Sequence, residues 1–176
     1  MTLPICRWTF PQEQLGRDLL TRVLAARGLS GPEEQEAYLH GNLKALPEPE
    51  ALPGVSKAAP HLLDAIDQGR SIAIYGDYDV DGITSVAILW HILRAIAPDA
   101  HIQTYIPHRV DEGYGLNCEA LSHLHEEGAQ VVITVDCGVT AVEEVAHARG
   151  LGMDMIITDH HRPDAHAVLP DAVAIV

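Results

Sequence analysis

The chain has 176 residues, enough for one domain with a sizeable core and a small helical appendage. Apolar residues make up 47% and charged residues 20%, the balance of a soluble globular protein, and no apolar run is long enough to cross a bilayer. No signal peptide is visible, so we expect a cytoplasmic protein with no membrane partner. Three widely spaced cysteines indicate neither a disulfide framework nor a cysteine zinc site.

The net charge of −14 argues weakly against a nucleic-acid binder, which usually has a basic face. The chain has 25 acidic and only 11 basic residues. Carboxylates that bind divalent cations would account for part of this excess, and solvated helix surface for another part. The charge alone therefore does not decide between these functions.

Residues 1–57 predict a helical N-terminal region and a linker. Between residues 11 and 40, leucines and valines recur at helical spacing, and Gly31-Pro32 separates two helices. Residues 41–56 hold three prolines among small and acidic residues, which is typical of a linker. We therefore expect a domain boundary between residues 57 and 58.

From residue 58 the pattern alternates between helix and strand. Helices are expected at 58–68, 82–97, 117–127 and 139–149, and strands at 71–75, 101–106, 130–135, 153–158 and 172–176. Strands joined by helical crossovers predict an α/β fold, a parallel β-sheet with helices on both faces. Ligands bind beyond the carboxyl ends of the strands in such a sheet.

Three polar clusters directly follow three of the predicted strands. The first holds Asp77, Asp79 and Asp81, the second Asp136, and the third Asp159, His160 and His161. Parallel strands would bring all three clusters to one edge of the sheet. Packed carboxylates repel one another unless a cation holds them, and Mn²⁺ or Mg²⁺ suits oxygen ligands with some imidazole nitrogen.

Simpler interpretations exist for single clusters. A calcium loop that starts at Asp77 would need glutamate at its twelfth position, where this chain has Ile88. Asp81 or Asp136, taken singly, could be a helix N-cap, and adjacent surface histidines can occur by chance. None of these interpretations explains three such clusters at successive strand ends.

The motifs Tyr-Gly-Asp-Tyr-Asp-Val-Asp-Gly-Ile-Thr-Ser, Val-Asp-Cys-Gly and Ile-Thr-Asp-His-His occur at 75–85, 135–138 and 157–161. In this order and spacing they resemble the DHH phosphoesterase superfamily, and within it the RecJ family of bacterial 5′-to-3′ exonucleases specific for single-stranded DNA. Three further segments resemble RecJ, at 24–29, 106–117 and 174–176. The resemblance extends over essentially the whole chain.

The resemblance implies a two-metal phosphodiesterase site that holds Mn²⁺ or Mg²⁺. It assigns the metal ligands to Asp77, Asp79, Asp81, Asp136 and His160, with Asp136 bridging the ions. It makes Asp136, His160 and His161 catalytic, with His161 on the scissile phosphate. We expect Asp159 to orient an imidazole from behind the ligands.

Arg109 and Tyr114 lie in a loop after the second strand of the α/β region, on the same sheet edge. Arg109 could grip a terminal 5′-phosphate and Tyr114 could stack on a base. Alternatively, Arg109 pairs with Asp111 or Glu112, and Tyr114 only packs the loop.

The implied function is hydrolysis of single-stranded DNA from a 5′-phosphate, in DNA repair and recombination. The family also implies helicase and single-strand-binding proteins as partners. It places one more aspartate ligand and a second domain beyond the DHH motif, so we expect a fragment, truncated at its C-terminal end. The alternatives are a phosphodiesterase for short oligonucleotides or cyclic dinucleotides, and a non-catalytic metal-binding fragment.

Overall fold

The computed structural model describes residues 18–176, which divide into two compact units, one ending at Pro47 and one spanning Glu48–Val176. The first unit contains α1 (Leu19–Ala26), α2 (Pro32–Leu39) and the 3-10 helix η2 (Leu43–Ala45). The Asp18 side chain caps α1 by accepting a hydrogen bond from the Thr21 backbone NH. The predicted helices are therefore confirmed from residue 18 onward, while residues 11–17 of that prediction lie outside the described residues.

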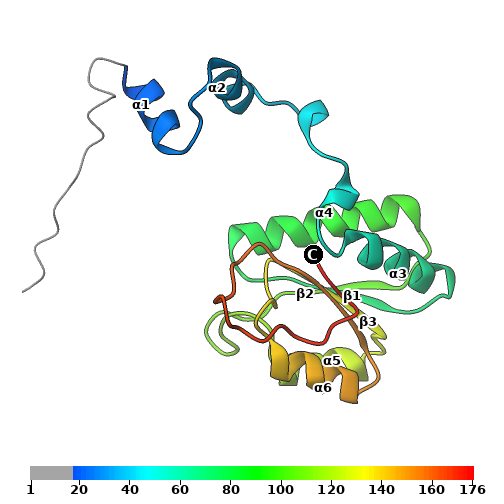
Figure 1. Cartoon of the computed structure of the whole chain (residues 1–176). Coiled ribbons are helices and arrows are strands. Elements are labelled where there is room, and N and C mark those ends of the chain that lie inside the picture. The colour runs from blue at the N-terminus through cyan, green and yellow to red at the C-terminus, as the bar shows by residue number, and fades with distance from the viewer. Residues whose placement is uncertain (1–17) are drawn as a thin grey trace, which may run out of the picture. The chain divides into compact units, whose positions relative to one another are not determined.

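The second unit is an α/β domain with a five-stranded parallel sheet (Figure 1). Its elements are η3 (Pro49–Ala51), α3 (Val55–Asp67), β1 (Ile72–Tyr75), α4 (Val80–Ile96), β2 (Ile102–Tyr105), α5 (Cys118–Glu126), β3 (Val131–Val135), α6 (Val142–Gly150), β4 (Asp154–Thr158) and β5 (Ala174–Ile175). The strand order is β2-β1-β3-β4-β5, and every neighbouring pair is parallel. The predicted fold class is confirmed.

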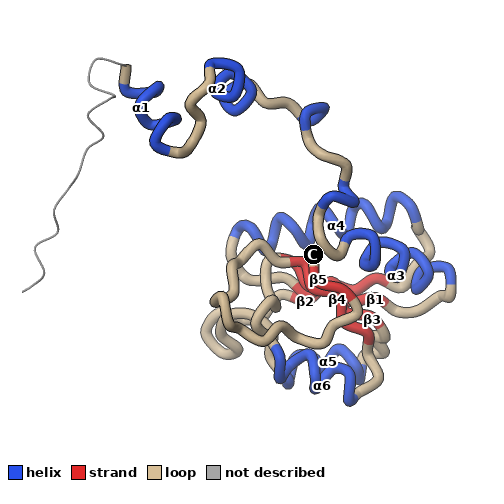
Figure 2. Tube along the Cα trace, viewed as in Figure 1, coloured by secondary structure: helices blue, strands red, loops and turns tan. Residues whose placement is uncertain are grey.

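Helices cover both faces of this sheet, with α3 and α4 on one face and α5 and α6 on the other (Figure 2). All residues of β1 and β3 are buried, because these central strands pack against a helical layer on each side. Successive side chains of β1 accordingly alternate between two separate cores, with Ile72 and Ile74 facing α3 and α4, and Ala73 and Tyr75 facing α5.

The compact α/β unit begins ten residues before the expected boundary at 57/58. Gly54 explains part of this difference, because it lies directly against β5. An added Cβ would stand 1.9 Å from the Ile175 carbonyl oxygen, and the Gly54 backbone is left-handed at φ 83°. The expected linker thus contacts the sheet at Gly54.

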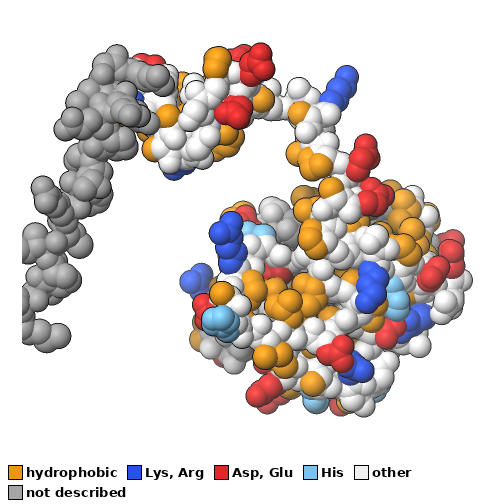
Figure 3. Space-filling model, in the orientation of Figure 1, with side chains coloured by type: hydrophobic (Ala, Val, Ile, Leu, Met, Phe, Trp, Pro, Cys, Tyr) orange, Lys and Arg blue, Asp and Glu red, His pale blue; other side chains and the backbone are white. Residues whose placement is uncertain are grey.

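None of the helices in residues 18–176 combines the length and apolar character that a bilayer crossing requires. On the visible face of the α/β unit, acidic side chains are spread among basic and histidine side chains (Figure 3). This distribution agrees with solvated surface as one source of the negative charge.

Candidate metal centre

Asp136 follows β3 directly and adopts an unusual backbone conformation. Its φ of 64° is the only positive value at a non-glycine residue in the described chain. Left-handed backbone at such a residue costs on the order of 1 kcal/mol or more and is concentrated at functional sites. The turn holds Asp136 8% exposed at the carboxyl edge of the sheet, where its backbone NH donates to the Thr158 carbonyl.

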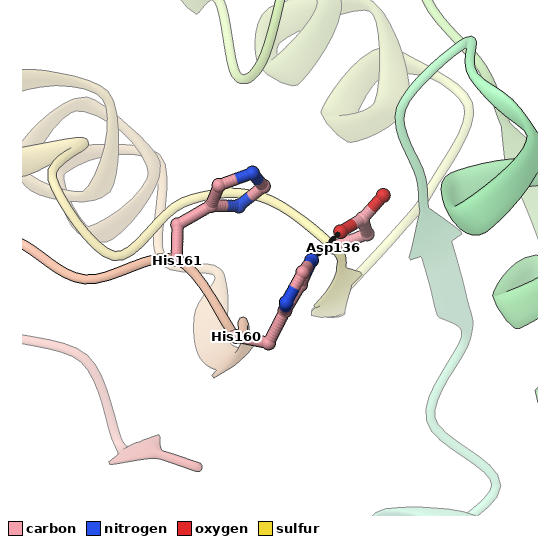
Figure 4. A group of neighbouring side chains, drawn as sticks. All are labelled: Asp136, His160 and His161. Carbon is pink, nitrogen blue, oxygen red and sulfur yellow. Dashed lines mark ion pairs between the residues drawn. The ribbon is translucent and has the colours of Figure 1, made fainter. Parts of the chain in front are cut away.

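His160 and His161 follow β4 and converge on this carboxylate (Figure 4). The His160 Nε2 atom lies 3.0 Å from Asp136 Oδ1. One ligand atom from each of Asp136, His160 and His161 can be chosen so that all three lie within 4.8 Å of one another. The two imidazoles are exposed while the carboxylate is buried, so a cation could reach the group from solvent.

Asp77 is the second buried carboxylate at this edge. It lies two residues after β1, is fully buried, and neither of its oxygens has a hydrogen-bond partner among the described residues. Asp136 is the other buried carboxylate, and its polar neighbour is His160, with Nε2 3.0 Å from Oδ1. Buried carboxylates without partners carry a large desolvation cost, which bound cations would remove. The donor set therefore fits hard divalent ions.

Asp79, in the acidic loop, and Asp136 differ in the direction in which their pKa values are shifted. The Asp79 carboxylate caps α4, accepting from the backbone NH groups of Asp81 and Gly82 at 2.9 and 3.0 Å. These hydrogen bonds, chiefly the one from Gly82, lower the pKa of Asp79. Burial and the nearby Asp79 charge raise the pKa of Asp136, although His160 and His161 oppose this shift. Two carboxylates with oppositely shifted pKa values thus face the same site.

The acidic edge lines an open cleft of about 610 Å³. Asp81, Asp136, Asp159 and His160 line it together with Thr84 and Ser85 from α4 and several apolar side chains. Asp81 is therefore exposed on the same cleft as Asp136, although it lies outside the group of three. The structure thus gathers the predicted ligands at one edge, but only Asp136 and His160 of them belong to the tight group, with His161.

Asp159 is buried behind the histidines. Its Oδ2 atom accepts from the Val139 backbone NH at 3.0 Å, and its Oδ1 atom accepts from the His161 backbone NH at 3.0 Å. The same Oδ1 atom lies 2.8 Å from His161 Nδ1. With its side chain only 2% exposed, Asp159 can fix the orientation of the His161 ring.

This contact leads to a prediction for the pKa of His161. Hydrogen bonding to Asp159 raises the pKa of His161 above its ordinary value of 6.5. The stabilisation from this pair should be complete below pH 6.5 and should be lost as the pH rises through the raised pKa. Asp159→Asn should lower the His161 pKa, as measured by an NMR titration of the imidazole resonances. An unchanged His161 titration in that variant would contradict the pairing.

Arg109 and Tyr114 also lie beside this edge. The Arg109 Cζ atom lies 5.1 Å from the centroid of the Tyr78 ring. The Tyr114 hydroxyl lies 3.4 Å from His161 Nε2, and burial, aided by the charge of Asp77, raises the pKa of Tyr114 to about 12. Tyr114 thus contacts the candidate site directly, while sequence patterns gave no indication of a role for Tyr78.

The two acids considered as alternative partners of Arg109 have other partners. Asp111 lies 2.6 Å from His108 Nδ1. Glu112 accepts from the Tyr105 hydroxyl and from the His108 backbone NH. Within residues 18–176, neither acid forms an ion pair with Arg109.

Comparison with known proteins assigns this architecture. Residues 71–176 match the model of the DHH family, N-terminal domain. The chain belongs to the DHH family. The matched DHH domain includes every residue predicted for the metal centre.

Several curated proteins are similar to this DHH chain over most of its length. It is 41% identical over 158 residues to the single-stranded-DNA-specific exonuclease RecJ of Bacillus subtilis (strain 168), covering 90% of this chain and 20% of that protein. It is 39% identical over 158 residues to RecJ of Escherichia coli (strain K12), covering 90% of this chain and 26% of that protein. The chain thus spans about a fifth to a quarter of the length of these relatives.

Two solved structures also resemble the DHH chain. A crystal structure of exonuclease RecJ bound to manganese superposes with a TM-score of 0.64 at 39% identity, over 74% of this chain and 31% of that one. The structure of RecJ in complex with Mn²⁺ from Thermus thermophilus gives a TM-score of 0.60 at 32% identity, over 89% of this chain and 23% of that one. Both neighbours share the fold described above.

Proposed function

We propose that this DHH chain carries out metal-dependent hydrolysis of phosphodiester bonds, as a 5′-to-3′ exonuclease on single-stranded DNA. The observation that carries the proposal is a pair of buried carboxylates beside His160 and His161: Asp77, which has no hydrogen-bond partner among the described residues, and Asp136. Relatives named single-stranded-DNA-specific exonuclease, and a RecJ neighbour solved with manganese, support the same activity.

In this proposal Asp77, Asp79, Asp81, Asp136 and His160 would hold two Mn²⁺ or Mg²⁺ ions. Bound ions supply Lewis-acid activation of the phosphate and of the attacking water. The chain supplies the placement of the ligands: the left-handed turn at Asp136 places its carboxylate in the cleft, and Asp79 caps the start of α4.

His161 is the proposed contact for the scissile phosphate. Asp159 holds its Nδ1 atom and favours the imidazolium form, so a proton remains available on Nε2. In the structure this Nε2 atom faces the Tyr114 hydroxyl. A phosphate oxygen that enters the site would replace that weak contact with a charge-assisted hydrogen bond.

Substrate binding is proposed to involve Arg109 and Tyr114. Arg109 has no carboxylate partner among residues 18–176, so its guanidinium is available to a terminal 5′-phosphate. Tyr114 is 55% exposed beside His161 and offers a ring for base stacking. The proposal also includes a role in DNA repair and recombination and a cytoplasmic location. The proposed partners are a helicase and a single-strand-binding protein.

The experiment incubates the chain with Mn²⁺ and a single strand carrying a labelled 5′-phosphate. We expect release of labelled nucleotide from that end, and we expect Asp136→Ala to lower the rate by at least about a hundredfold, as when a catalytic group is removed. Asp67→Asn, an exposed change at the last residue of α3, should leave the rate unchanged.

Parallel incubations separate the competing functions. Turnover of a cyclic dinucleotide or a short oligonucleotide, without nucleotide release from the long strand, would favour the small-substrate phosphodiesterase. A folded chain that binds Mn²⁺ but turns over none of these substrates would contradict a catalytic role and would leave a metal-binding function.

A further inference from the structure

Tyr78 lies between two proposed metal ligands, Asp77 and Asp79, but has no part in the chemistry above. Its ring is half-buried and contacts both residues of the proposed substrate loop. The Arg109 Cζ atom lies 5.1 Å from the ring centroid, within the range of a cation–π interaction. The Tyr114 ring meets Tyr78 edge to face, with centroids 6.1 Å apart.

The two acidic residues near Arg109 interact with other groups, so neither pairs with its guanidinium. Glu112 is held by the Tyr105 hydroxyl at the end of β2 and by the His108 backbone NH. Asp111 pairs with His108. Both neighbouring acids are thus engaged with other groups, and the Arg109 guanidinium lies over the face of the Tyr78 ring.

The position of Tyr78 in the chain gives this contact a consequence for substrate binding. The backbone that carries the ring also carries Asp77 and Asp79, so the ring is part of the acidic loop itself. A guanidinium that rests on this ring is therefore joined to the loop that carries two of the proposed metal ligands. Tyr114 connects the same ring to His161, through an edge contact and its hydroxyl.

We propose that Tyr78 is a positioning residue, which holds Arg109 at the distance from the metal centre that a 5′-phosphorylated end requires. This inference rests on the proposed function, because it assumes that Arg109 binds a terminal phosphate. It extends that function by naming the element that makes the site prefer a phosphorylated end.

The proposal is tested by measuring KM and kcat of hydrolysis for two strands of the same sequence. One strand carries a 5′-phosphate and the other a 5′-hydroxyl. Tyr78→Leu should raise KM for the phosphorylated strand by about two- to fivefold, the effect of losing an exposed cation–π contact, with little change in kcat. The hydroxyl strand should be unaffected, and Tyr78→Phe, which keeps the ring, should behave like the parent chain. In an Arg109→Ala background, Tyr78→Leu should have no further effect.

An NMR measurement tests the contact without activity. The Arg109 Nε–H resonance should carry a ring-current shift that Tyr78→Leu removes and Tyr78→Phe keeps. An Arg109 resonance that does not respond to Tyr78→Leu would overturn the proposal. An equal loss for both strands, or additive effects of Tyr78→Leu and Arg109→Ala, would also overturn it.

Binding of a fluorescent single strand, measured by anisotropy with Ca²⁺ in place of Mn²⁺, distinguishes failure of the proposed function from failure of the role of Tyr78. If the chain neither binds nor hydrolyses either strand, the proposed function is wrong and this inference falls with it. If strands bind with a preference for the 5′-phosphate, but Tyr78→Leu keeps that preference, only the role of Tyr78 is wrong.

Discussion

Replacing Asp136 with asparagine should make the metal-free chain more stable and should abolish its stabilisation by Mn²⁺. The Asp136 carboxylate is buried and lies near the Asp79 charge, and these two effects outweigh its contact with His160. Removing a buried charge of this kind should raise the free energy of unfolding by about 1–3 kcal/mol. Asparagine also tolerates the left-handed backbone at φ 64°, so the turn should remain intact.

The stability difference between Asp136→Asn and the parent chain should depend on pH in a defined direction. Because the pKa of Asp136 is raised in the folded chain, ionisation opposes folding. The cost is absent below the ordinary value of 3.8, grows as the pH rises above that value, and is complete above the raised pKa. The stability advantage of Asp136→Asn over the parent chain should therefore be largest near neutral pH and should disappear in acid.

Thermal unfolding with and without Mn²⁺ measures both effects. At a hundredfold excess of Mn²⁺ over its dissociation constant, the parent chain should gain about 2.7 kcal/mol, a rise in Tm of about 10 °C. Asp136→Asn should lose most of this rise, while the exposed control Asp67→Asn should keep it. Equal melting temperatures for Asp136→Asn and the parent chain under both conditions would contradict a metal centre at Asp136.

The sequence was sufficient to predict the fold of residues 58–176, because the signals there are local. Buried parallel strands appear as unbroken apolar runs, and helix caps such as Asn117 mark where helices begin. The expected boundary at 57/58 differs from the structure because Gly54 packs against β5, which lies at the far end of the chain. No local pattern reports such a contact.

The candidate site could likewise be predicted only in part from the sequence. Parallel topology was enough to expect the acidic loop, Asp136 and the two histidines at one sheet edge. Their different roles depend on contacts that sequence patterns do not report. Asp79 caps the N-terminus of α4, and Asp159 forms hydrogen bonds with Val139 and His161. The contact between Tyr78 and Arg109 joins two loops, so neither residue indicates it alone.

Gly82→Ala should unfold or strongly destabilise the α/β unit, although alanine usually favours a helix. Gly82 is buried in the first turn of α4, and an added Cβ would stand 2.4 Å from the Asp77 carbonyl oxygen and 2.6 Å from the Asp77 nitrogen. These are backbone atoms of the acidic loop, so relief requires the loop and the helix to separate. We expect a loss of at least about 1–3 kcal/mol, the usual cost of overpacking, and weaker Mn²⁺ binding in any folded fraction.

Gly150→Ala provides the matched control for this substitution. Gly150 ends α6, and an added Cβ there would meet no atom within 4 Å. Alanine should therefore be neutral or should stabilise the chain by up to about 1 kcal/mol through its helix propensity. Chemical unfolding followed by circular dichroism should thus give opposite signs for the two glycine variants. If Gly82→Ala matched Gly150→Ala in stability and in its Mn²⁺ response, close contact between α4 and the acidic loop could not be what shapes the metal centre.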